Sequence, residues 1–166
     1  MTRSWGRQGG TGVSVLHLVL PLLLAACGQS PEEMRAEAQK SLDAGDPAKA
    51  MQLADEAILA CQDKAIVYRL EQIRLDALAK QGKGSDVAKE LERLAGAYPE
   101  QVKAALYRAP ADKVKGGGDT PGAIDILAAG DKRFPEDPSF KQGIEEIKNA
   151  GVNPEEVEQL KALGYL

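Results

Sequence analysis

The residue best placed for chemistry is Cys27, whose thiol follows an apolar run that ends in Leu24-Ala25-Ala26. Arg3 and Arg7 lie upstream of that run. A positive start, an apolar middle and small residues at the end are the three zones of a secretory signal. The apolar stretch is about 14 residues long, short of the roughly 20 that a bilayer-spanning helix needs. Residues 1–26 are therefore predicted to be an export signal and not a permanent membrane span.

The tetrapeptide Leu24-Ala25-Ala26-Cys27 resembles the lipobox of bacterial lipoproteins. In that family the cysteine thiol is alkylated with diacylglycerol, the signal is cut just before it, and the new amino terminus is acylated. The resemblance implies that Cys27 is the lipidated first residue of the mature protein, with these lipid groups and no other cofactor. Each buried methylene adds about 0.8 kcal/mol of membrane affinity. The alternative is an ordinary signal whose cleavage site happens to lie near a cysteine.

The residues after Cys27 bear on where the protein is held. Gly28 stands where an aspartate would resemble the inner-membrane retention pattern of enteric lipoproteins, so the outer membrane is favoured. The tether, residues 27–30, reaches on the order of 10 Å beyond the anchor. We therefore predict a bacterial envelope protein on the periplasmic face of the outer membrane, with the lipid bilayer as one partner through Cys27.

Loss of residues 1–26 removes Trp5 and His17, the only tryptophan and the only histidine. A mature chain without imidazole has no histidine general base and no histidine-containing zinc site. The acidic residues also lack the spacing of a calcium loop, so no metal is predicted. Without Arg3 and Arg7, 19 basic residues face 25 acidic ones, a net charge of about −6 that argues against a nucleic-acid ligand.

The remaining reactive groups give little support for catalysis. Paired carboxylates stay open as a route to hydrolysis, but few serine, threonine and aromatic residues are available to build a substrate pocket. We predict that the protein is not an enzyme. Cys61 has no internal partner once Cys27 is lipidated, and its helical spacing from Ala54 and Ala57 predicts that it packs inward. The alternative for Cys61 is an intermolecular disulfide.

Helix starts recur along the chain as a capping residue followed by proline. These pairs are Ser30-Pro31, Asp46-Pro47, Thr120-Pro121, Asp137-Pro138 and Asn153-Pro154. Almost no stretch alternates with period two, so the mature chain is predicted to be all-α, with seven or eight helices. They are expected over about 31–44, 47–61, 64–80, a fourth capped by Ser85, a fifth from near 100 that Pro110 interrupts, 121–134, 138–150 and 154–163.

An internal repeat underlies this helical pattern. Gly45-Asp46 and Gly118-Asp119 precede alanines at the same spacing, and a third alanine lies between them. The alanines are Ala50, Ala88 and Ala123, in steps of 38 and 35 residues, and small residues follow seven positions later at Ala57, Ala95 and Gly130. The pattern resembles the tetratricopeptide repeat, a helix-turn-helix unit of about 34 residues. A generic helical bundle with small residues at its contacts is the alternative.

The resemblance implies a short α-solenoid of helical hairpins over residues 31–137, with residues 138–166 as C-terminal capping helices. In the tetratricopeptide family the first helices of successive units line a groove that holds a peptide or helix of another protein. Carried over to this chain, the groove-facing polar residues are Arg35, Gln39, Arg69, Asp76 and Arg108. The alternative is that these residues form a solvated helix face. The tail, residues 164–166, is either a cap on the last repeat or itself a ligand.

These patterns together predict a function as well as a fold. They indicate a membrane-anchored exported lipoprotein that binds other proteins through a helical-repeat groove, as a scaffold or assembly factor of a cell-envelope complex. The alternative is a structural or solute-binding envelope lipoprotein without a dedicated protein partner.

Overall fold

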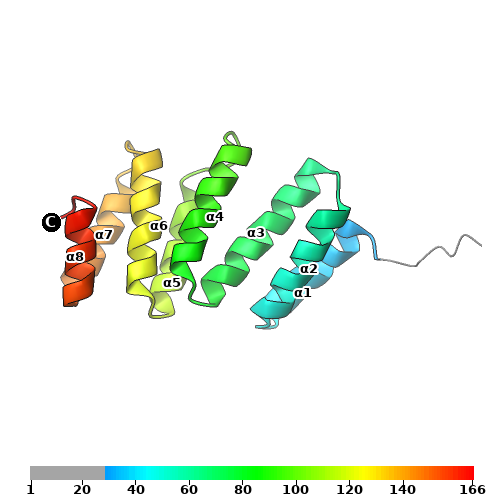
Figure 1. Cartoon of the computed structure of the whole chain (residues 1–166), viewed down its shortest axis with the longest axis horizontal. Helices are drawn as coiled ribbons and strands as arrows, with labels where there is room; N and C mark the ends of the chain where they lie inside the picture. Colours follow the sequence, from blue (N-terminus) through cyan, green and yellow to red (C-terminus); the bar gives the residue numbers. More distant parts are fainter. Residues whose placement is uncertain (1–28) are drawn as a thin grey trace, which may run out of the picture.

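The computed structural model describes residues 29–166, and within them every regular element is an α-helix (Figure 1). The predicted all-α class is confirmed for this part of the chain. The eight helices are α1 (Pro31–Asp43), α2 (Pro47–Ala60), α3 (Lys64–Lys80), α4 (Gly84–Ala97), α5 (Ala105–Gly116), α6 (Thr120–Arg133), α7 (Ser139–Ala150) and α8 (Pro154–Ala162). The predicted export signal and Cys27 lie outside the described residues. No helix in residues 29–166 is long and apolar enough to cross a membrane.

Three of the predicted helix starts form as expected. Ser30 and Asn153 each make a reciprocal capping box with a glutamate in the first turn, and Asp46 accepts the backbone N–H of Lys49. The start of α6 is shifted by one residue, because the side chain of Asp119 and not of Thr120 accepts a backbone N–H.

Three predictions in the middle of the chain are wrong. The fifth helix begins at Ala105 and not near residue 100. Ser85 does not cap α4, because its hydroxyl donates to Asp125 instead and the N-cap residue, Lys83, gives no side-chain hydrogen bond. Pro110 does not interrupt α5, which runs through it to Gly116. Proline removes one helical hydrogen bond, but Pro110 is buried, so its apolar contacts offset part of that loss.

The repeat is present in the structure with a slightly different register. The N-cap residues of the second helices are Asp46, Lys83 and Asp119, which are 37 and 36 residues apart. The residue that corresponds to Ala50 and Ala123 is therefore Val87, which is fully buried, and not the half-buried Ala88. A glycine with positive φ precedes each N-cap, and this backbone conformation is one that glycine adopts without strain.

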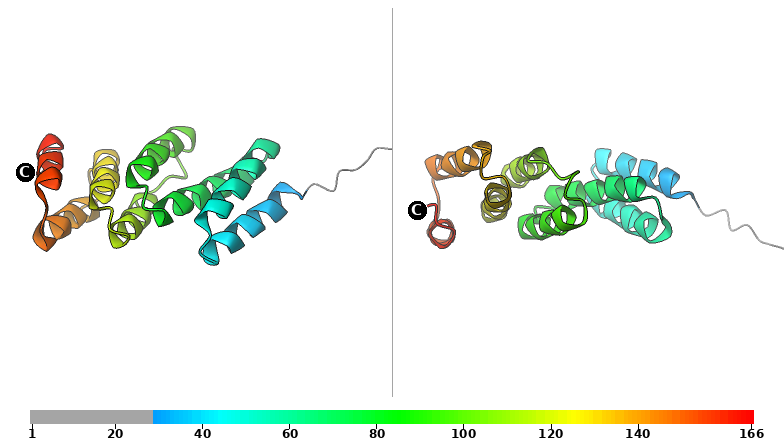
Figure 2. Two further views of the ribbon diagram at one scale, coloured as in Figure 1. Left: turned by 60° about the horizontal axis from the view of Figure 1, so that its bottom comes forward. Right: turned by 90° about the horizontal axis from the view of Figure 1, so that it is seen from above.

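Contacts between helices stay local along the chain, as in a solenoid. Helix α3 packs against α1, α2, α4 and α5, and α6 packs against α4, α5, α7 and α8. Seen from above in Figure 2, α1, α5 and α7 lie on one side of the molecule, and α2, α4 and α8 lie on the other. The described residues therefore form a short helical-hairpin solenoid.

The core divides into two clusters that meet at α3. The alanine cluster comes from α1, α2 and one side of α3, and consists of Ala38, Leu42, Ala50, Ala54, Ala57, Leu70, Ile73 and Ala77. The aromatic cluster comes from the other side of α3 and from α4 to α8. Its centre is a trio of rings, in which the Tyr107 centroid lies 5.8 Å from Phe134 and 6.3 Å from Phe140.

The C-terminal tail folds back onto the last helices. Tyr165 packs against the aromatic cluster, and its hydroxyl donates to the Asp131 carboxylate at 2.8 Å. Lys148 donates to the Tyr165 carbonyl oxygen at 3.2 Å. These contacts are those expected of a cap, whereas Leu163 and Leu166 stay exposed.

The predicted inward packing of Cys61 is wrong. Cys61 is the C-cap residue of α2 and has already left the helical conformation, so the stripe that contains Ala54 and Ala57 does not extend to it. Its thiol is half-buried and lies 3.6 Å from the Asp63 carbonyl oxygen, to which it donates.

Candidate functional site

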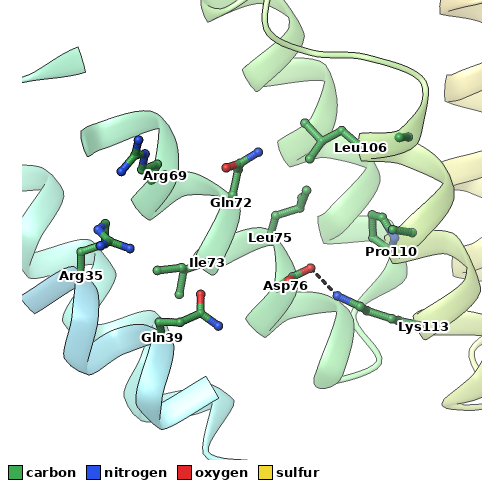
Figure 3. Close-up of a pocket in the computed structure, with 12 residues that line it drawn as sticks. Arg35, Gln39, Arg69, Gln72, Ile73, Leu75, Asp76, Leu106, Pro110 and Lys113 are labelled. Carbon is green, nitrogen blue, oxygen red and sulfur yellow. Dashed lines mark hydrogen bonds and ion pairs between the residues drawn. The ribbon is translucent and has the colours of Figure 1, made fainter. Parts of the chain in front are cut away.

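A cleft of about 400 Å³ crosses the face formed by α1, α3 and α5 (Figure 3). These are the first helices of three successive hairpins. The residues that line it are Arg35, Gln39, Arg69, Gln72, Ile73, Leu75, Asp76, Ala105, Leu106, Ala109, Pro110 and Lys113. Because α3 lies between α1 and α5 and packs against both, its side chains form the middle of the cleft.

Helical spacing explains which side chains the cleft collects. On α3, Arg69, Gln72, Ile73 and Asp76 stand at positions i, i+3, i+4 and i+7, and these share one face of a helix. On α1, Arg35 and Gln39 are four residues apart and share a face in the same way. Four of the five polar residues predicted from the sequence, Arg35, Gln39, Arg69 and Asp76, therefore line one cleft.

The fifth residue, Arg108, lies outside the cleft. The face of α5 that lines the cleft carries Leu106, Ala109, Pro110 and Lys113, again at i, i+3, i+4 and i+7. Arg108 is two positions after Leu106 and points elsewhere, where it donates to the Ser139 carbonyl oxygen at 2.8 Å. That contact ties α5 to the start of α7, so the structure gives Arg108 a packing role between helices.

Gln72 and Lys113 also line the cleft, although the sequence did not predict them as site residues. Gln72 could have been found from its i+3 spacing to Arg69. Lys113 could not be placed as long as Pro110 was expected to end the helix, because a broken helix carries no register across the break.

The charged groups in the cleft are paired unequally. Lys113 donates to Asp76 at 2.7 Å, so these two charges compensate each other. Arg35 donates to Glu32 at 2.7 Å. The hydrogen bond from Arg35 lowers the pKa of the Glu32 carboxyl below its ordinary value, and the positive charges of Arg35 and Arg69 act in the same direction. Arg69 itself has no hydrogen bond or ion pair with any side chain among residues 29–166.

The floor of the cleft is apolar. Ile73 and Leu75 are buried beneath it, and Leu106 and Pro110 form the wall on α5. Asp76 and Lys113 each keep 40% of their side-chain surface exposed, so the cleft is open to solvent and does not enclose its contents. One accessible surface therefore offers apolar contacts, amide hydrogen bonds from glutamine and positive charge.

A second charged cluster lies at the junction of α2, α3 and α4, and we call it the arginine junction. Arg74 contacts Asp55 at 2.7 Å, Glu71 at 2.9 Å and Glu90 at 3.1 Å. Arg93 reaches both Glu71 and Glu90 at 2.6 Å. Burial opposes ionisation of Glu90, but the hydrogen bond from Arg93 and the charges of both arginines lower its pKa below the ordinary value. The junction joins the helices of the two core clusters.

The titratable side chains that line the cleft are Arg35, Arg69, Asp76 and Lys113. Its lining contains one carboxylate, Asp76, and so lacks the pair that an acid–base hydrolase needs. In the part of the chain that the structure describes, no group of three or more histidine, cysteine, aspartate or glutamate side chains is arranged to hold a metal ion. No protein-family model, curated protein or solved structure matches the chain.

Proposed function

We propose that this protein is a lipid-anchored bacterial envelope protein that binds another protein through the cleft on α1, α3 and α5, as a scaffold or assembly factor. The observation that carries the proposal is the cleft itself. Three successive first helices place apolar, amide and cationic side chains on one open face. Such a mixture of an apolar centre with polar groups around it is typical of surfaces that recognise other proteins.

The anchoring part of the proposal rests on the sequence before residue 29. An apolar run followed by Leu24-Ala25-Ala26-Cys27 supports lipidation at Cys27 and a position on the periplasmic face of the outer membrane. The first helix begins at Pro31, only three residues after Gly28, so the folded part lies close to the anchor. A protein held in this way meets its partners at the membrane surface.

The anchor is tested by fractionating cells that express the wild-type protein or the Cys27→Ser variant. We expect the wild-type protein in the outer-membrane fraction, with a diacylglyceryl group on its N-terminal peptide by mass spectrometry. The variant should keep its full-length mass and lose that modification. An unmodified wild-type protein recovered in the soluble fraction would contradict the anchor.

The binding role is tested by chemical crosslinking in intact envelopes, followed by identification of the attached proteins. We expect one dominant partner, which is lost when Arg35 and Arg69 are both changed to glutamate. A Lys89→Glu variant is the control for a charge reversal outside the cleft, because Lys89 is exposed on α4 and does not line the cleft. No reproducible partner, with the protein still in the membrane, would instead indicate a structural or solute-binding lipoprotein.

A further inference from the structure

The charge of the cleft has the opposite sign to the charge of the protein. The whole chain carries a net charge of −4, whereas the cleft is lined by three cations, Arg35, Arg69 and Lys113, and one carboxylate, Asp76. Opposite charges on two surfaces speed their encounter and select between partners. A local positive surface on an acidic protein therefore singles out the cleft as the place where an acidic group is attracted.

The positive side chains at the two ends of the cleft differ in whether a carboxylate pairs with them. At the α5 end, Lys113 is paired with Asp76 at 2.7 Å. At the α1 end, Arg35 shares its charge with Glu32, and Arg69 has no partner within residues 29–166. Arg69 is thus the cation of the cleft that no hydrogen bond or ion pair within these residues compensates, although the Glu32 carboxylate lies near enough to attract it. The guanidinium of Arg69 offers a planar set of donors that matches a carboxylate.

Apolar surface lies directly beside this charge. Ile73 is one turn along α3 from Arg69, and Leu75 and Leu106 continue the apolar lining toward α5. An occupant that satisfies both features carries carboxylates and aliphatic side chains within a few residues of each other. Gln39 and Gln72 add amide groups, which can donate to and accept from a peptide backbone.

We infer that the cleft binds an acidic segment of another protein, with an aspartate or glutamate side chain on Arg69 and neighbouring aliphatic side chains over Ile73, Leu75 and Leu106. This inference rests on the proposed function and specifies the partner's chemistry. A small ligand is a poorer fit, because small-ligand sites bury most of their ligand, and Asp76 and Lys113 remain 40% exposed here. A segment of a larger partner covers an open cleft from outside.

The test is the binding of labelled peptides to the full-length protein in detergent, measured by fluorescence anisotropy. The probe alternates glutamate and leucine over seven residues and is blocked at both ends, so that it carries no terminal carboxylate. One control peptide replaces each glutamate by lysine, and another replaces each leucine by serine. We expect only the glutamate–leucine peptide to bind, and its affinity should fall as salt is raised.

Variants of the protein test whether Arg69 binds a carboxylate of the probe. We expect Arg69→Glu to weaken binding of the probe by about tenfold or more, as the loss of a charge-assisted hydrogen bond implies. Arg69→Lys should keep part of the affinity, and Lys89→Glu, which changes the net charge by the same amount, should change it by less than about twofold. Circular dichroism of each variant checks that the helices are intact, and Arg69 is exposed enough that they should be.

Three results would overturn the inference. They are no binding of the probe, equal binding of the lysine peptide, or equal loss in Arg69→Glu and Lys89→Glu. Direct binding of octanoate, measured by calorimetry, to a protein that does not bind the probe would assign the cleft to a small amphipathic anion. Crosslinking distinguishes these failures from failure of the proposed function. A partner that crosslinks to the wild-type protein and not to the Arg35 and Arg69 double variant would still support the proposed function, even if the segment in the cleft were not acidic.

Discussion

The two core clusters use the same hairpin plan with side chains of different size. At four, eight and eleven residues after the N-cap, α2 carries Ala50, Ala54 and Ala57, whereas α4 carries Val87, Leu91 and Leu94, and all six are buried. The alanines leave room for α2 to pack closely against both α1 and α3. Helix α4 carries larger residues at these positions, and it comes closest to α6 at another point, where Gly84 faces Gly122. Helix geometry is thus set by the turn and cap residues, and the distance between helices by the side chains at their points of contact.

This difference has a consequence for stability. An alanine buries less apolar area than leucine or phenylalanine, so the alanine cluster gains less hydrophobic free energy per residue than the aromatic cluster. The alanine cluster depends instead on close approach, which tolerates no added volume. The two regions should therefore respond oppositely to substitution: the aromatic cluster to lost volume and the alanine cluster to gained volume.

The largest effect is expected in the aromatic cluster. Phe140 is fully buried, contacts Tyr107 and Phe134, and lies against Gly130, where a Cβ atom would collide with its ring. We expect Phe140→Ala to lower the free energy of unfolding by about 3–5 kcal/mol. Urea unfolding followed by circular dichroism measures the change. A loss below about 1 kcal/mol would mean that the ring trio does not hold α5, α6 and α7 together.

The next largest changes in stability are expected when side chains are exchanged between the two clusters at one repeat position. Ala54 and Leu91 both stand eight residues after their N-caps and are both fully buried. We expect Ala54→Leu to destabilise by about 1–3 kcal/mol through overpacking. Leu91→Ala should cost about 2–5 kcal/mol through the cavity that it leaves. If Ala54→Leu proved neutral in urea unfolding, the close approach of α2 to its neighbours would not be a tight constraint.

A smaller effect is expected at the C-terminal cap. Tyr165→Phe removes the hydrogen bond to Asp131 and should cost about 1 kcal/mol. Burial, with the neighbouring Asp131 carboxylate, raises the pKa of Tyr165 to about 12. Because the folded state favours the neutral phenol, this contribution is complete below the ordinary pKa near 10 and is lost as the pH rises from there through 12.

Alkaline titration followed by tyrosine absorbance checks this expectation. The wild-type protein should show one tyrosine that ionises near pH 12, and that signal should disappear in Tyr165→Phe. If the variant instead loses signal near pH 10 and keeps the tyrosine that ionises near pH 12, Tyr165 lies in solvent and does not act as part of a cap.

The smallest effect is expected at the arginine junction between the clusters. Because the pKa of Glu90 is lowered in the folded protein, its contribution to stability is present above about pH 4.5 and is lost as the pH falls below that value. We expect Glu90→Gln to flatten the dependence of the unfolding free energy on pH between 5 and 3. Glu158→Gln is the matched control, since Glu158 pairs only with Lys161 on the exposed surface of α8. An identical pH dependence in both variants would show that the junction does not join the clusters energetically.

The local features of this fold could be predicted from the sequence because they depend on adjacent residues. Ser30, Asp46 and Asn153 cap their helices through hydrogen bonds to backbone groups two or three residues away, and that information is present in the sequence. The features that depend on packing between distant parts of the chain could not be predicted from the sequence. Leu75 and Ala79 belong to the aromatic cluster, whereas Leu70, Ile73 and Ala77 belong to the alanine cluster. Both sides of α3 are buried because it has helices on several sides.

In the candidate site, too, local features could be predicted from the sequence and features set by packing could not. Arg35, Gln39, Arg69 and Asp76 were placed correctly on one face because α1 and α3 are uninterrupted helices, whose register can be read from the sequence. Arg108 was misplaced because its side chain donates to the Ser139 carbonyl oxygen, a contact with a distant residue that the local sequence does not reveal. The predicted role of Cys27 depends on residues that the structure does not describe, and it stays a prediction.

The central claim is that the face formed by α1, α3 and α5 is the binding face. The most direct measurement places a photoreactive amino acid at position 72, in the cleft, or at position 52, on the exposed side of α2, in cells that express the protein. We expect an adduct with one protein from position 72 and none of comparable yield from position 52. Adducts from position 52 alone, or equally from both positions, would contradict the central claim.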